Sequence, residues 1–178
     1  MTSFATATPV PLASAINSQL HGATFYDCYS IDVSGERHTA LEYFLVAFAR
    51  TPLWVERLMW LRNKLVQLFG LKDLGGMSGF DVLKPASAYL LGDRVGIFTL
   101  ISNTDDEVLL GDSDTHLDVV LAVFRHRSVA GGVQPVSITT VVHVHNGLGR
   151  LYMLLVKPMH KLIAPAVLNR IVVDNSSR

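Results

Sequence analysis

The chain has 178 residues, a length typical of one domain. Hydrophobic residues make up 49% of it and charged residues only 17%, which excludes disorder as its main state, because disordered chains are poor in apolar residues. The 15 basic residues equal the 15 acidic ones, so a strongly electrostatic partner such as nucleic acid is not expected.

The first residues do not read as a targeting signal. Residues 1–20 hold no Lys or Arg, and Thr, Ser and Pro interrupt their apolar positions, whereas a secretory signal has a basic start and a continuous apolar stretch. No run of 18 apolar residues occurs, so a membrane span is not expected. The single cysteine, Cys28, allows neither an internal disulfide nor a Cys-based zinc site and is expected to be buried. We predict a cytoplasmic location.

The N-terminal part predicts a tail, a short helix and a strand. Residues 1–10 are expected to be a flexible tail, and residues 11–178 a single domain. A short helix is predicted over 12–20. Residues 23–33 alternate loosely and are rich in Phe and Tyr, which favours a strand.

Two helices are predicted next. Thr39 and Glu42 have the spacing of a capping box, which predicts a helix to about Ala49. A second helix begins at Thr51-Pro52, with Thr as N-cap and Pro at the first helical position, and is expected to end at Phe69 before Gly70. Its apolar residues recur at steps of three and four, so it must bury a broad face.

The second half predicts a sheet followed by a long helix. Four strands are expected, over 94–102, 107–111, 117–127 and 136–145. Residues 148–166 place apolar side chains at three- and four-residue steps, which predicts an amphipathic helix of about 20 residues. Pro158 and Pro165 lie inside it and are expected to kink or break it.

This order of elements is that of an α+β helix-grip fold, a curved antiparallel sheet around a long C-terminal helix with two short helices after the first strand. Several separated segments also resemble the bacterial family called domain of unknown function 2867, over most of the chain after the tail. These segments are Gly22–Asp27, Leu100–Gly111, Leu148–Tyr152 and Lys157–Ile163.

The resemblance implies a branch of the START and polyketide-cyclase superfamily (SRPBCC, Bet v 1-like). Such folds usually hold a hydrophobic cavity between the sheet and the C-terminal helix. Some members carry lipids, some catalyse cyclisation or dehydration, and some sense ligands. The domain is also found behind NAD(P)-binding reductase-like domains, but this chain lacks the glycine fingerprint of such a domain, and no cofactor is predicted. No catalytic residues carry over from the family.

Residues expected to face the cavity are the candidate ligand contacts. Trp54 and Leu58 belong to the apolar face of the second helix. The alternative to a cavity wall is that this face touches a membrane surface. Tyr152 lies on the apolar stripe of the last helix, where it either bonds a ligand or is an ordinary core tyrosine. The full set of predicted ligand contacts is Trp54, Leu58, Phe98, His116, His143, Tyr152 and Met159.

A group of histidines supplies the catalytic candidates. His143 and His145 lie two apart on one strand and share a face, and His116 and Asp118 repeat that relation on the preceding strand. If the strands pair as a hairpin, these four residues come together, where they suit acid–base chemistry or zinc or iron, or are merely solvent-facing. We predict no metal, and we note that a one-residue slip in register reverses the face.

Two charged groups have ordinary explanations. The acidic residues between 105 and 114 lack the spacing of a known calcium loop and suit turns. Arg150, Lys157 and Lys161 lie on one side of the last helix, with His160 nearby. They either contact the head group of a ligand or form the solvent-exposed face of the helix.

Three functional hypotheses follow. The first is a binding module for a small hydrophobic molecule, lipid- or polyketide-like, because apolar pockets need few polar groups. The second is an enzyme on such a ligand, with His143 or His145 as base and Asp118 or Tyr152 as partner. The third is an assembly module, such as a homodimer, because exposed apolar patches often become interfaces.

Overall fold

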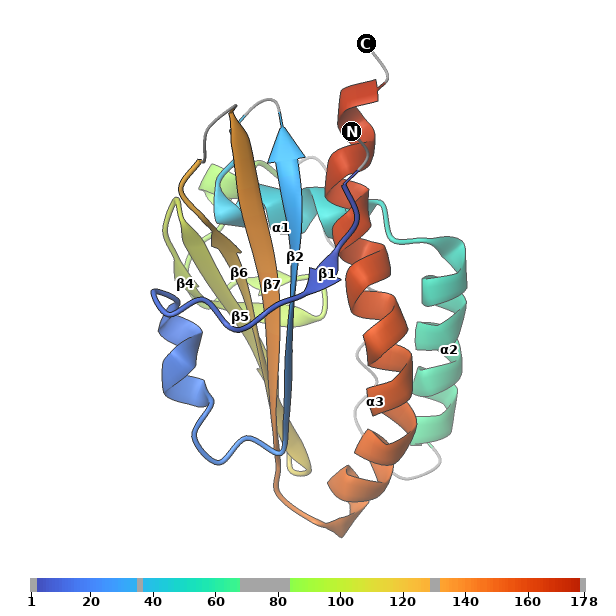
Figure 1. Ribbon diagram of the computed structural model, residues 1–178. Helices are drawn as coiled ribbons and strands as arrows, with labels where there is room; N and C mark the ends of the chain where they lie inside the picture. Colours follow the sequence, from blue (N-terminus) through green and yellow to red (C-terminus); the bar gives the residue numbers. More distant parts are fainter. Residues whose placement is uncertain (1–2, 35–36, 68–83, 129–131, 177–178) are drawn as a thin grey trace.

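The computed structural model describes residues 3–34, 37–67, 84–128 and 132–176, without the side chains of 61–67 and 173–176. It shows an α+β fold in which a seven-stranded antiparallel sheet faces a long C-terminal helix (Figure 1). This arrangement is compatible with a helix-grip fold.

Every neighbouring pair of strands in the sheet is antiparallel, and the strand order is β1-β2-β7-β6-β5-β4-β3. The long central strands are rich in Val, Ile and Thr, which suit a pleated, half-buried surface. The strands are β1 (Thr6–Ala7), β2 (Phe25–Ser34), β3 (Arg94–Val95), β4 (Phe98–Asn103), β5 (Glu107–Ser113), β6 (Leu117–Arg125) and β7 (Val133–Val144).

The N-terminal segment differs from the expected tail and helix. Thr6 and Ala7 form β1, which pairs with the edge of β2. The short helix is a 3-10 helix, η1 (Ala15–Gln19), and the Ser14 side chain accepts a hydrogen bond from the backbone at its start. Two helices do follow the long strand β2, but β2 is the second strand of the fold, not the first.

Two boundaries of the sheet also differ from prediction. A single strand over 94–102 is wrong: Gly96, with a φ of 61°, turns the chain so that β3 folds back onto β4. Only a residue without a side chain adopts that backbone angle readily. The last strand begins at Val133, three residues before its predicted start, and its residues 133–135 pair with residues 32–34 of β2.

The first of the two helices begins as predicted, but Thr51 does not cap the second, because its hydroxyl donates to the carbonyl of Phe48. α1 (Ala40–Ala49) has both hydrogen bonds of the capping box between Thr39 and Glu42. α2 (Leu53–Gln67) follows Pro52. The predicted end of this helix at Phe69 lies outside the described residues. A further 3-10 turn, η2 (Ala86–Ala88), leads into β3.

The C-terminal helix α3 (Gly147–Leu168) is continuous through both prolines, so the expected break does not occur, and it runs on into η3 (Asn169–Ser176). The carbonyls that lose their donors to Pro158 and Pro165 belong to Leu154 and Lys161, which are exposed, so water can satisfy them. In the part of the chain described, only 147–172 is long and apolar enough to cross a membrane, by length and composition alone.

Apolar residues are buried on both faces of the sheet. The inner face packs on α1, α3 and η3, with Phe44, Leu100 and Leu110 almost completely buried. On the outer face, Ile16 of η1 packs against Ala122 and Val141 in a smaller cluster. The two faces therefore place side chains in separate environments, and strand register decides which environment each residue enters.

Candidate functional site

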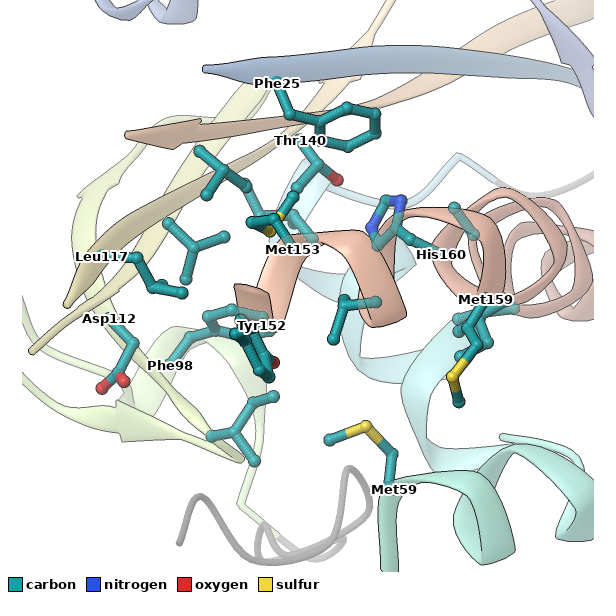
Figure 2. A pocket seen from close by; sticks show the side chains of 18 of the residues that line it. Phe25, Met59, Phe98, Asp112, Leu117, Thr140, Tyr152, Met153, Met159 and His160 are labelled. Atoms are coloured by element: carbon teal, nitrogen blue, oxygen red, sulfur yellow. The ribbon is translucent and has the colours of Figure 1, made fainter. Parts of the chain in front are cut away.

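A cavity of about 160 Å³ lies between the inner face of the sheet and helices α2 and α3 (Figure 2). Its walls come from both halves of the chain and are mostly apolar. The lining residues are Phe25, Phe48, Leu58, Met59, Ile97, Phe98, Asp112, Asp114, Leu117, Val119, Leu121, Ile138, Thr140, Val142, Tyr152, Met153, Val156, Met159, His160, Ile163, Ala164 and Val167.

The two-residue period of the strands selects the sheet wall of the cavity. Residues Ile138, Thr140 and Val142 of β7 line it, and so do their neighbours on β6, because Val119 is the register partner of Val142 and Leu121 that of Thr140. Directly opposed residues of antiparallel strands point to the same face. The alternate residues of both strands face the outer side.

The three- and four-residue period of α3 supplies the opposite wall. Met153, Val156, His160, Ile163 and Val167 repeat at these steps and all line the cavity. The helix begins where Asn146 caps it: Asn146 Oδ1 accepts a hydrogen bond from the Gly149 amide, 3.0 Å away. This cap fixes the start of the helix that carries the apolar wall.

The carboxylates at the rim are already engaged. Arg94 donates from Nη1 to Asp112 Oδ1 over 2.9 Å. Asp114 Oδ1 accepts from the amides of His116 and Leu117, as in an Asx turn. These side chains therefore stabilise the start of β3 and the turn between β5 and β6, and nothing in their bonding requires calcium. Among the described residues, no cluster of three or more His, Cys, Asp or Glu has the geometry to hold a metal.

The structure brings four of the predicted ligand contacts into the cavity wall: Leu58, Phe98, Tyr152 and Met159. Trp54 is 43% exposed and does not line it, because it lies on the outer side of α2. His116 and His143 are also outside the lining. Whether the four wall residues touch a ligand stays a prediction.

Three of the four residues of the predicted histidine cluster come together, and they do so on the outer face of the sheet. His143 pairs in register with Asp118, and His145 Nε2 lies 3.0 Å from Asp118 Oδ2. His143 Nε2 lies 2.9 Å from the carbonyl of Gln19 at the end of η1. Since their strand neighbours Val142 and Val119 line the cavity, these three side chains point away from it.

His116 supports the start of α3 instead. Its Nδ1 lies 2.9 Å from Asn146 Nδ2, which can donate to it, and its backbone carbonyl accepts from the His145 amide. The same Asn146 caps α3. His116 thus belongs to the connection between the β5–β6 turn and the helix, not to the cavity or to a metal centre.

Asp118 gives a prediction for the dependence of stability on pH. Burial would raise the pKa of its carboxyl, but hydrogen bonds from Ser113 and His145 outweigh this and leave the pKa below its ordinary value. A carboxyl whose pKa is lowered on folding stabilises the protein above its unfolded pKa, and this contribution is lost as the pH falls through the folded value. Both partners are partly exposed, so the effect is at most about 1 kcal/mol.

We therefore expect Asp118→Asn to be less stable than the wild type at about pH 7 and equal to it well below the ordinary Asp pKa of about 3.9. Urea unfolding of both proteins across this range measures the difference. A stability gap that does not narrow on acidification would contradict the assignment.

A second acid–histidine pair, which the sequence analysis did not identify, lies at the cavity. His160 of α3 lines it, and His160 Nδ1 lies 3.1 Å from Asp27 Oδ2 on β2. The sequence indicates the position of each member of this pair. Asp27 follows Phe25 at the strand period, which puts a carboxylate on the inward face, and His160 lies four residues after Val156 on the apolar stripe of α3.

The fold and the site together define an α+β protein with an apolar cavity between its sheet and its helices α2 and α3. The chain matches the family described as Protein of unknown function (DUF2867) over residues 19–167, and it belongs to that family. The matched region includes β2 to β7, the cavity and nearly all of α3. No curated protein and no solved structure matches the chain.

Proposed function

We propose that this protein binds a small, mainly apolar molecule in the cavity between the sheet and α3, and that its fold is the helix-grip fold of the START and polyketide-cyclase superfamily. The observation that carries the proposal is the lining itself: most of its residues are aliphatic, aromatic or Met, with few polar groups. Ligand sites typically combine such walls with a small number of polar groups that orient the ligand.

The volume of the cavity limits the ligand. An apolar cavity of about 150 Å³ holds one benzene molecule, and this cavity measures about 160 Å³. A molecule with a single ring or a short alkyl chain therefore fits these walls without rearrangement, whereas a lipid with two acyl chains exceeds this volume. Within the range of lipid- and polyketide-like ligands, the geometry favours the smallest members.

The outer-face histidines do not support catalysis on such a ligand. His143, His145 and Asp118 lie on the opposite side of the sheet from the cavity. A general base must reach the proton that it abstracts, directly or through one water. We therefore place binding ahead of an acid–base reaction at that cluster.

Filling the cavity tests the proposal. Ala164 lines it from α3 and is buried, so Ala164→Leu is expected to abolish the binding of toluene. Ala166 lies on the same helix, is only partly buried and does not line the cavity, so Ala166→Leu is the matched control. In the wild type and the control, toluene at ten times its Kd should raise the free energy of unfolding by about 1.4 kcal/mol.

The measurement is thermal or urea unfolding with and without toluene, together with the native mass of the purified protein. A retained molecule of a few hundred daltons or less that leaves on denaturation would identify the natural ligand. If toluene stabilises neither the wild type nor Ala166→Leu, or stabilises all three proteins equally, the cavity is not a binding site.

A further inference from the structure

Two polar residues of the cavity wall, Thr140 and His160, lie where β2, β7 and α3 meet, beside Asp27 of β2. Asp27 on β2 is the register partner of Thr140 on β7, so the two side chains stand next to each other on the inner face. His160 reaches Asp27 from α3 across 3.1 Å. Figure 2 shows His160 on the same side of the cavity as Thr140 and Phe25.

The Asp27 carboxylate orients the imidazole of His160. A carboxylate only accepts hydrogen bonds, so in neutral His160 the proton belongs on Nδ1, which faces Asp27. Nε2 is then left as an acceptor. Among the described residues, the bond to Asp27 is the one hydrogen bond of this side chain. The ring is held further by an edge-on contact with Phe25, with the ring centres 5.8 Å apart.

Thr140 adds a donor at the same place. It lines the cavity and is 4% exposed, and within the part of the chain described its hydroxyl makes no hydrogen bond. Asp27 Oδ1 is also buried without a partner there. Polar groups inside proteins normally have partners, so the Thr140 hydroxyl, which lines the cavity, is available to a polar group that arrives with a ligand.

We infer that the ligand carries a hydroxyl group, which donates to His160 Nε2 and accepts from the Thr140 hydroxyl while the rest of the molecule fills the apolar cavity. A hydroxyl fits because it is both a donor and an acceptor, whereas a carbonyl oxygen can accept but has no proton for Nε2. With the size limit of the cavity, this specifies a phenol or another small alcohol. The inference rests on the proposed function and specifies the class of ligand.

Phenol and toluene test it because they have nearly the same shape and differ by a hydroxyl in place of a methyl group. The ratio of their affinities, measured by calorimetry at about pH 8, where histidine is ordinarily neutral, reports the hydroxyl contacts alone. We expect His160→Leu to lower the phenol-to-toluene ratio about tenfold, because it leaves the ligand's O–H unpaired in an apolar site.

A second variant avoids the risk that His160→Leu exposes Asp27 to a fully apolar neighbour and unfolds the protein. Thr140→Val keeps the side-chain shape and removes only the hydroxyl. We expect it to fold as stably as the wild type, since no hydrogen bond within the described residues is lost, and to lower the ratio several-fold. Thr139→Val is the control: Thr139 is equally buried but donates to Cys28 Sγ on the outer side, so the ratio should not change.

The outcomes separate the two proposals. Two results together support the inference. The phenol-to-toluene affinity ratio falls in His160→Leu and Thr140→Val but not in Thr139→Val. The ¹⁵N signals of the His160 ring shift with phenol and not with toluene. Toluene binding with an unchanged ratio in the His160 and Thr140 variants overturns the hydroxyl contact and leaves the apolar cavity as a binding site. If the wild type binds neither molecule, the proposed function fails, and the hydroxyl contact with it.

Discussion

Phe44→Ala is expected to lower the free energy of unfolding by about 4 kcal/mol, which is the largest effect that we predict for a single core residue. Phe44 of α1 is 1% exposed. Its ring stacks on Phe48, with centres 4.1 Å apart, and meets Phe98 edge-on at 6.3 Å. Removing the ring loses both the transfer free energy of the buried atoms and the two aromatic contacts, and it leaves a cavity. Urea unfolding measures the loss.

The position of Phe44 connects this loss to the cavity. Phe48 and Phe98 are cavity walls, and Phe44 supports them from behind. The space left by the ring should therefore join the existing cavity, so that benzene stabilises Phe44→Ala more than it stabilises the wild type. Phe44→Leu, which keeps most of the volume, should cost only about 1 kcal/mol and show no extra response to benzene. A cost for Phe44→Ala below about 1 kcal/mol would contradict the packing of α1 against the sheet.

The architecture followed from short-range patterns in the chain. The capping box of α1 satisfies backbone amides within four residues, and Pro52, directly before α2, marks the start of that helix in the same local way. The apolar period of α3 is also local. Two predictions failed where one residue acts against such a pattern: Gly96 divides an otherwise continuous strand, and the prolines do not break α3, where the residues whose carbonyls lose a donor are exposed.

The site required information that is not local. The proximity of His143 and His145 to Asp118 follows from strand alternation, and the structure contains it. The face on which they lie depends on how β7 pairs with β2 and β6, and a change of one residue would reverse it. The Asp27–His160 pair joins residues 133 positions apart in the sequence. Each of its members lies on the inward face of its own element, but only the packing of α3 on β2 shows that they meet.

Gly149→Ala is expected to cost about 3 kcal/mol or more, although alanine is the better helix former. Gly149 lies in the first turn of α3, next to the β5–β6 turn. A methyl group there would lie 2.4 Å from the carbonyl oxygen of His116 and 2.9 Å from Cγ1 of Val144. The His116 carbonyl cannot move aside easily, because it also accepts a hydrogen bond from the His145 amide. The helix must therefore shift away from the sheet, which disturbs the cavity wall that it carries.

Gly147→Ala is the matched control, because a methyl group at Gly147, two residues earlier in the same helix, meets no atom within 4 Å. It should leave the free energy of unfolding unchanged to within about 1 kcal/mol. Unfolding of the two variants in urea, with and without toluene, distinguishes the effect of helix propensity from that of the clash with His116. Gly149→Ala should lose stability and its stabilisation by toluene, whereas Gly147→Ala should keep both. Equal stability of the two variants would mean that α3 does not begin against the His116 carbonyl, and the wall of the cavity opposite the sheet would have to be placed anew.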